Sequence, residues 1–238
     1  MVIPVRIRDF RQEQMGAALV YFPVVGLLIG LFLALVSSVL ILFGLPQVTV
    51  SIAVVVALAA VTGGMHLDGV ADTADAFFSG KNKDEMLAIM RDPRVGALGV
   101  VSICCVLLSK VGLVNAFPAA RSMYPLILMG VLSRWSLVMA MFIFPYARRE
   151  GRASSFMQGM SPARFWIATV TALVCAVMIG KMQGACCMAV TAVSTYIAGR
   201  RIQKKIGGIT GDTLGAVCEM NEIIILFSAV VTNAFLYR

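Results

Sequence analysis

Charged residues are scarce in this chain of 238 residues. Lysine, arginine, aspartate and glutamate together make up 13% of the sequence, hydrophobic residues make up 60%, and the mean hydropathy is +0.91. An ordinary soluble domain carries about a quarter charged residues, so this composition excludes one. It predicts a single integral membrane domain over residues 1–238, with no separate soluble module.

Two further features narrow the choice of function. None of the six cysteines belongs to a Cys-x-x-Cys pair, which argues against a zinc or thiol–disulfide site. The formal net charge of +8 would suit nucleic acid, but in a membrane protein it is typical of cytoplasmic loops that face anionic lipid. We therefore expect membrane lipid as a partner and no nucleic-acid binding.

The apolar residues gather in long runs. A spanning helix needs roughly 20 mostly apolar residues, and within lipid the backbone must satisfy its own hydrogen bonds, which favours helices. We predict an all-α polytopic bundle of about seven transmembrane helices. Their approximate ranges are 17–43, 48–62, 95–117, 125–145, 165–179, 185–199 and 214–236, with a polar loop over 63–94 and a short hairpin over 180–184.

The loops between these runs are alternately rich and poor in basic residues. The positive-inside rule places the rich loops in the cytoplasm, which predicts a cytoplasmic N-terminus and an external C-terminus. Nearly all strongly polar groups then fall near the cytoplasmic face, as in an enzyme that draws its substrates from the cytoplasm. The rich side holds Arg6, Arg8, Arg11, Lys81, Lys83, Arg91, Arg94, Arg148, Arg149, Arg152, Arg164, Arg200, Arg201, Lys204 and Lys205, and the poor side holds Arg121, Lys181 and Arg238.

Three of the chain's twelve acidic residues follow the second apolar run. Asp68, Asp72 and Asp75 stand at i, i+4 and i+7, positions that share one face of a helix. Mg²⁺ typically takes one or two carboxylates and leaves its other positions to water and phosphate oxygens. We interpret this face as a Mg²⁺ site for a diphosphate, the alternative being a solvated surface helix.

His66 is the one histidine of the chain. It either contacts the substrate or transfers a proton, or it makes a structural hydrogen bond.

Arginines form the second set of candidate residues. Arg91 and Arg94 bracket a helix break at Pro93, and arginine binds phosphate through two parallel hydrogen bonds. The alternative is that both only mark the cytoplasmic side. Arg134 lies inside the fourth run, where an arginine is costly and needs a carboxylate or a substrate phosphate as partner.

A glycine-rich segment precedes the last run. Gly208 and Gly211 permit close backbone approach to a ligand, and Thr210 between them can cap the following helix, whose free N–H groups favour an anion. A plain turn is the alternative.

Glu219 and Glu222 share a face of the helix that follows the glycine-rich segment, at i, i+3. Arg134 is the only obvious cation nearby, so the two glutamates need a further partner, either a second metal ion or a polar substrate.

Five stretches of the chain carry a family resemblance. They are GGMHLDGVADTADAFFSG at 63–80, IMRDPRVGALGV at 89–100, LSRW at 132–135, FPYAR at 144–148 and GGITGDTLGAVCEMNE at 207–222. In this order and spacing they resemble the cobalamin synthase family, the adenosylcobinamide-GDP ribazoletransferases. The resemblance covers almost the whole chain, and the first and last stretches are highly specific.

The resemblance implies a Mg²⁺-dependent enzyme of the prokaryotic cytoplasmic membrane, with its active site facing the cytoplasm. It would join adenosylcobinamide-GDP to α-ribazole or α-ribazole 5′-phosphate and release GMP, late in cobalamin biosynthesis. A homo-oligomer and an association with other corrinoid-assembly enzymes are open hypotheses. Carried onto this chain, the resemblance implies that the metal ligands are Asp68, Asp72, Asp75 and Glu222. It implies as catalytic groups His66, Glu219 and Asp212, the last as base or further ligand. It implies as phosphate-binding groups Arg91, Arg94, Arg134, Gly208, Thr210 and Gly211.

Three other classes fit less well. CDP-alcohol phosphotransferases also displace a nucleoside monophosphate, but their motif continues with Ala-Arg and two spaced aspartates. Here Asp72 follows Ala71, and no aspartate lies between Asp75 and Asp84. Membrane prenyltransferases pair two Asp-rich loops around a Mg²⁺-diphosphate but need a tunnel for a lipid chain. A small-solute transporter would scatter polar groups through the bilayer.

Overall fold

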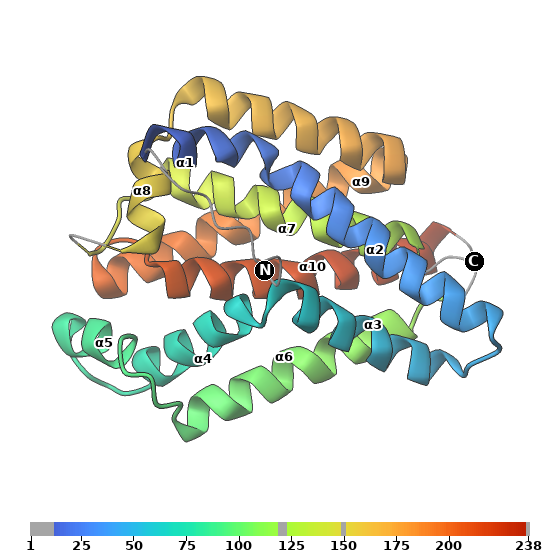
Figure 1. Cartoon of the computed structure of the whole chain (residues 1–238), viewed down its shortest axis with the longest axis horizontal. Coiled ribbons are helices and arrows are strands. Elements are labelled where there is room, and N and C mark those ends of the chain that lie inside the picture. The colour runs from blue at the N-terminus through green and yellow to red at the C-terminus, as the bar shows by residue number, and fades with distance from the viewer. Residues whose placement is uncertain (1–11, 119–122, 149–150, 237–238) are drawn as a thin grey trace.

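The chain folds as a bundle of helices (Figure 1). The structure is a computed structural model that describes residues 12–118, 123–148 and 151–236. Within these ranges all named elements are helical, and the one extended pairing is an isolated bridge between Tyr146 and Ile209. The predicted all-α class is therefore confirmed. Six basic residues used to orient the chain lie outside the described residues: Arg6, Arg8, Arg11, Arg121, Arg149 and Arg238.

The predicted apolar runs coincide with the long helices. The elements in chain order are α1 (Gln12–Ala18), a 3₁₀ turn η1 (Leu19–Tyr21), α2 (Phe22–Leu42), α3 (Gln47–Thr62), α4 (Met65–Phe77), α5 (Lys83–Ile89), α6 (Ala97–Asn115), α7 (Met123–Ile143), α8 (Arg152–Gln158), α9 (Pro162–Ile206) and α10 (Gly211–Leu236). Five helical stretches of the described chain are long and apolar enough to cross a membrane, and a bent pair of α3 and α4 would make a sixth. The chain therefore has the helices of a membrane protein.

Helix α9 contains a sharp reversal. Lys181 has non-helical backbone angles of φ 50° and ψ −132°, and Gly184 lies so close to the backbone of Ala176 that a Cβ there would overlap its carbonyl oxygen. In Figure 1 the yellow first part of α9 runs along the upper edge and the orange second part returns beneath it. The predicted hairpin over 180–184 is confirmed, since two helical arms meet at the break at Lys181.

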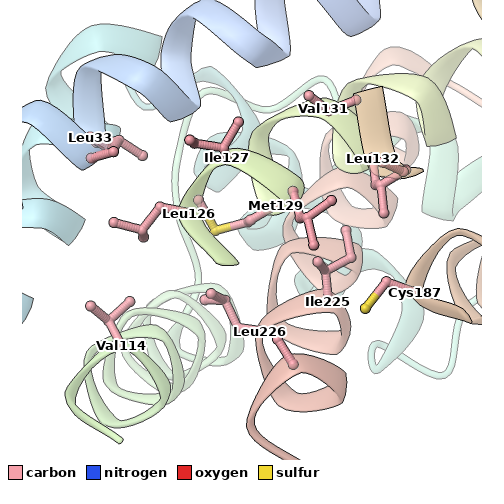
Figure 2. Packing of buried hydrophobic residues seen from close by; sticks show 14 of the residues in the cluster. Leu33, Val114, Leu126, Ile127, Met129, Val131, Leu132, Cys187, Ile225 and Leu226 are labelled. Atoms are coloured by element: carbon pink, nitrogen blue, oxygen red, sulfur yellow. The ribbon is translucent and has the colours of Figure 1, made fainter. Parts of the chain in front are cut away.

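Helix α7 forms the centre of the bundle. All its residues from Pro125 to Val138 are buried, and it packs on α2, α9 and α10. Gly26 on α2 and Gly130 on α7 let these two backbones touch, because a Cβ on either would overlap the other's carbonyl oxygen. Figure 2 shows the resulting core, in which Leu126, Met129 and Leu132 of α7 meet side chains from its neighbours, among them Leu33, Val114, Ile225, Leu226 and Cys187.

The outer faces of the helices carry large apolar side chains. Leu28 and Leu35 on α2, Leu108 on α6 and Met178 on α9 are all more than 60% exposed. Exposed apolar surface on this scale is costly in water and is expected where helices face lipid. The surface thus agrees with the composition.

The predicted polar segment over 63–94 contains two helices, of which α4 carries the three aspartates as their spacing predicted and α5 was not expected. Gly63 and Gly64 both have positive φ, of 65° and 67°, which glycine adopts without strain. This pair turns the chain by 90° between α3 and α4. Helix α5 then begins at a capping box formed by Asn82 and Glu85. The sharp turn directs α4 against α10 instead of out into solvent.

Candidate active site

The acidic segment forms helix α4, as its spacing predicts. Asp68 is exposed, and Asp72 and Asp75 are half-buried on the same helix face. The carboxylates of Asp68, Asp75 and, from α10, Asp212 all lie near enough to Asp72 to repel its negative charge. Asp72 therefore lies within electrostatic range of three other carboxylates where α4 and the start of α10 come together.

Two glycines allow this close approach of α4 and α10. A Cβ at Gly69 would overlap the backbone carbonyl oxygen of Asp212, and a Cβ at Gly215 would lie 3.2 Å from the backbone of His66. A side chain at either position would push the helices apart. The glycines therefore set the distance between the acidic face of α4 and Asp212.

Asp75 has a clear structural task. One of its carboxylate oxygens accepts the N–H of Gly96 at 2.7 Å, and the other accepts the N–H of Gly99 at 2.8 Å. These are free N–H groups at the start of α6, which carries no side-chain cap of its own, and a carboxylate there also matches the helix dipole. Asp75 thus ties α4 to α6, and this leaves Asp68 and Asp72 as the more available carboxylates of α4.

The stretch 144–148 pairs with the glycine-rich segment. The N–H of Ala147 donates to the carbonyl of Ile209 at 2.9 Å, and the N–H of Ile209 donates to the carbonyl of Pro145 at 2.8 Å. This short ladder brings Arg148 to Asp212, where Nη2 and Oδ2 are 2.8 Å apart. The Nε atom of Arg148 is buried and has no hydrogen-bond partner within the described chain.

Thr210 caps α10, as predicted. Its Oγ1 accepts the N–H of Thr213 at 3.2 Å, while its own N–H donates to Oγ1 of Thr213 at 2.8 Å. Gly208 is buried against the backbone of Pro145, and Gly211 opens on the cleft described next. The predicted close backbone approach at Gly208 is therefore made by the protein itself.

A cleft of about 260 Å³ lies between α4, α7, α8 and α10. Its polar groups are His66, Asp68 and Asp212, and its apolar wall includes Leu137 and Phe156. Nδ1 of His66 is buried and lacks a hydrogen-bond partner in the part of the chain that is described. Buried polar atoms are nearly always satisfied, so this nitrogen is well placed to receive a hydrogen bond from a ligand.

A second cavity of about 300 Å³ adjoins the first and shares His66 with it. Arg134 also lines it, pairs with Glu222 and donates to Ser133 at 2.9 Å. The sequence predicted a carboxylate or a phosphate as the partner of Arg134, and Glu222 is that carboxylate.

The two glutamates belong to a buried charge network. Lys110 of α6 lies 2.5 Å from Glu219 and also pairs with Glu222, which in turn pairs with Arg134. All four side chains are at most 5% exposed. Two cations thus face two carboxylates, and the sequence-based view that Arg134 was the obvious cation nearby was incomplete.

The arginines of the second segment differ from each other. Arg91 is exposed but lies near enough to act on the charge of Tyr146, as Arg148 and Asp212 do. Arg94 is 86% exposed and pairs with Asp92 at 2.6 Å, a contact that lowers the pKa of Asp92 to about 2. Arg91 therefore lies within electrostatic range of Tyr146, and Arg94 is engaged with Asp92 of its own loop.

A metal ion would have to be held with few protein ligands. In the described part of the chain, no three His, Cys, Asp or Glu side chains converge closely enough to enclose one. Mg²⁺ needs only one or two carboxylates when phosphate oxygens and water fill its other positions. The mutually repelling carboxylates of Asp68, Asp72 and Asp212 have the right donor chemistry for such an open site.

Sequence reasoning missed two residues of this region. Lys110 lies inside the apolar run 95–117, and a lone lysine within a spanning helix was the available signal. Arg148 was counted only as a basic loop residue, although it belongs to the FPYAR stretch. Its contact with Asp212 joins segments 64 residues apart, and spacing alone does not reveal such a contact.

Comparison with known proteins assigns the chain to a family. The model of the family described as cobalamin-5-phosphate synthase matches residues 2–230. The chain belongs to the cobalamin-5-phosphate synthase family. Membership confirms the resemblance carried by the five stretches and makes the chain a transferase of cobalamin biosynthesis.

Individual relatives support this membership. The chain is 38% identical over 225 residues to a protein of Chlorobium phaeobacteroides (strain BS1), covering 92% of this chain and 89% of the relative. It is 35% identical over 219 residues to one from Roseiflexus sp. (strain RS-1), covering 90% and 80%, and 36% identical over 225 residues to one from Escherichia coli (strain ATCC 8739), covering 92% and 89%. All three are named adenosylcobinamide-GDP ribazoletransferase. No solved structure matches the chain.

Proposed function

We propose that the chain transfers the cobinamide phosphate of adenosylcobinamide-GDP to α-ribazole or its 5′-phosphate and releases GMP. The names of its relatives support this reaction. We place the active site in the cleft between α4 and α10, because a buried nitrogen of His66 without a partner lies there with Asp68 and Asp212. Such a cleft combines a proton acceptor with groups that can bind a metal-bound diphosphate.

His66 is the proposed general base. The ribose hydroxyl would give its proton to Nδ1 of His66 while its oxygen bonds to the cobinamide-linked phosphorus. The bond from that phosphorus to the bridging oxygen breaks, and GMP leaves. We prefer His66 to Asp212 for this task because Nδ1 of His66 has no hydrogen-bond partner in the described chain, whereas the Asp212 carboxylate is already paired with Arg148.

The charged groups around the cleft would bind the diphosphate. Asp68 and Asp72, with Asp212 from α10, would hold Mg²⁺, which when bound neutralises charge on the diphosphate and on departing GMP. Arg148 and Arg91 lie on the same side and supply positive charge for phosphate oxygens. Arg134 lies deeper and is committed to Glu222.

We further propose a seven-span topology with the cleft facing the cytoplasm of a prokaryotic cell. Counting the two arms of α9 separately and α3 with α4 as one broken span gives seven. Basic residues gather around the cleft's end of the bundle: Lys83 lies beside Gly207, Lys205 bonds to Phe77, and Arg148 bonds to Asp212. The positive-inside rule places such an end in the cytoplasm.

The reaction is tested with purified protein in detergent, adenosylcobinamide-GDP, α-ribazole 5′-phosphate and Mg²⁺. GMP and the joined corrinoid product should appear together in equal amounts. Chelation of the metal should stop both, and added Mg²⁺ should restore both. Release of CMP from a CDP-lipid without corrinoid product would move the chain to the CDP-alcohol class and overturn the proposal.

A further inference from the structure

A separate cleft opens between α4, α6, α9 and α10. Its volume is about 520 Å³, within the range of roughly 300–1,000 Å³ that is typical of small-molecule sites. Most of its wall is apolar. The apolar lining includes Val70, Ala74 and Phe77 of α4, Val106 of α6, and Met220 and Ile223 of α10.

This cleft lies on the opposite side of α4 from the acidic face. Val70 and Ala74 line it, whereas Asp68 and Asp72 stand two residues before each of them. Residues two apart on a helix point to nearly opposite sides. A molecule in this cleft would therefore be separated by α4 from the groups proposed to act on substrate.

One edge of the cleft is positively charged. Arg201 and Lys205, one turn apart on α9, both line it and both are exposed. Lys205 donates to the carbonyl of Phe77 at 2.9 Å and lies 4.8 Å from the centre of its ring. No acidic residue lines the cleft, and neither cation forms a salt bridge with any described residue. The edge is thus suited to an anion.

A polar group inside the cleft also lacks a partner. Thr73 lines the cleft, and its Oγ1 is buried with no hydrogen bond within the described chain. Thr73 lies one helical turn, about 6 Å, before Phe77 and therefore further from the charged edge. Its hydroxyl is placed to bond an oxygen that lies between a charged head and an apolar tail.

We propose that this cleft binds one anionic phospholipid. The phosphate lies between Arg201 and Lys205, the Thr73 hydroxyl donates to an ester oxygen, and an acyl chain packs on the apolar wall. Each basic residue near a membrane surface adds to attraction for anionic lipid, and the absence of acidic neighbours keeps both charges available. A zwitterionic lipid would fill the apolar wall but gain less at the edge.

Binding is measured by native mass spectrometry of the purified full chain in detergent, titrated with phosphatidylglycerol or phosphatidylcholine. We expect one phosphatidylglycerol to bind in preference to phosphatidylcholine. The double variant Arg201→Gln/Lys205→Gln should lower its affinity about tenfold. The matched variant Arg200→Gln/Lys204→Gln removes the same charge from residues that do not line the cleft and should stay close to the parent. Equal losses in both variants would show diffuse attraction and overturn the proposal.

A second pair of variants tests the apolar wall. Val106→Trp should fill the cleft and reduce phosphatidylglycerol binding, whereas Val101→Trp, on the 57% exposed outer side of the same helix, should not. Unchanged binding by Val106→Trp, or equally strong binding of soluble glycerol 3-phosphate, would contradict a lipid site. No corrinoid substrate is present in these titrations, so their outcome is independent of the proposed transferase reaction.

Discussion

Asp72 occupies the middle of the acidic face of α4. The charges of Asp68 and Asp75 act on it along the helix and that of Asp212 acts from α10. Because Asp75 accepts two backbone N–H groups of α6, the site depends mainly on Asp68 and Asp72 for free carboxylate oxygens. A bound cation would relieve the repulsion among these groups.

Substitution of Asp72 tests the metal assignment. Asp72→Asn should reduce transfer by at least about 100-fold, because even outer-shell partners of a metal ligand cost roughly 10–100-fold when removed. GMP release in purified, detergent-soluble protein is the measurement. Asp84→Asn on exposed α5 is the control and should keep full activity. Normal GMP release by Asp72→Asn would remove this residue from the metal site.

Substitution of His66 tests the base. His66→Ala should lower kcat by about 100- to 10,000-fold, the usual contribution of general base catalysis, with little change in KM. Its neighbour in the cleft, Met65→Leu, should remain active because it contributes only apolar surface. A His66→Ala enzyme with more than a third of the parental kcat would assign the base to another group.

For single residues, the sequence was sufficient to predict the acidic groups of the site but not the cations that pair with them. The i, i+4, i+7 spacing was enough to place three aspartates on one face, because helix geometry is local. The cations that face Glu219 and Glu222 come from α6 and α7, and the approach of these helices is a tertiary contact that no local period encodes. Lys110 was overlooked as their partner, although a lone lysine within an apolar run was itself a local signal.

At the scale of elements, the site depends on how closely α4 lies on α10. The bend at Gly63 and Gly64 directs α4, and Gly69 and Gly215 set its contact distance. The long helices could be predicted from hydropathy, since a spanning run is itself a local feature. Helix α4 was indicated by the spacing of its aspartates, whereas α5 was not expected, because its seven residues carry no long apolar run.

A single methyl group should disturb this contact. Gly69→Ala places a Cβ on the carbonyl oxygen of Asp212, so it should destabilise the protein by about 1–3 kcal/mol and lower transfer. Gly112→Ala in α6 is the matched control, since nothing lies within 4 Å of its Cβ position and alanine favours a helix by about 1 kcal/mol. Thermal unfolding in detergent compares the two. Equal stability of both variants would show that α4 and α10 are not held by this contact.

At the scale of the whole molecule, the buried network joins three helices at the core. Lys110 belongs to α6, Arg134 to the central α7, and Glu219 and Glu222 to α10. The four charges balance, so the network is neutral only while every member is present. Loss of one member of a buried pair is strongly destabilising because a charge remains unpaired.

A double-mutant cycle tests this balance. Lys110→Met should destabilise the fold by about 3–5 kcal/mol, and adding Glu219→Gln should recover a substantial part because the pair is removed together. Unfolding temperature is the measurement, and Lys181→Met at the exposed reversal of α9 is the control. If the two effects simply add, Lys110 and Glu219 are not coupled as the structure shows them.

The most direct test of the account asks where the substrate binds. A photoreactive analogue of adenosylcobinamide-GDP would be cross-linked to the purified protein and the labelled peptides mapped by mass spectrometry. We predict labels in residues 65–77 and 211–222 that are removed by excess adenosylcobinamide-GDP and retained in His66→Ala, because that variant should lose turnover and keep binding. Competable labelling confined to the opposite end of the bundle, around residues 43–47, would contradict the assignment of the active site to the cleft between α4 and α10.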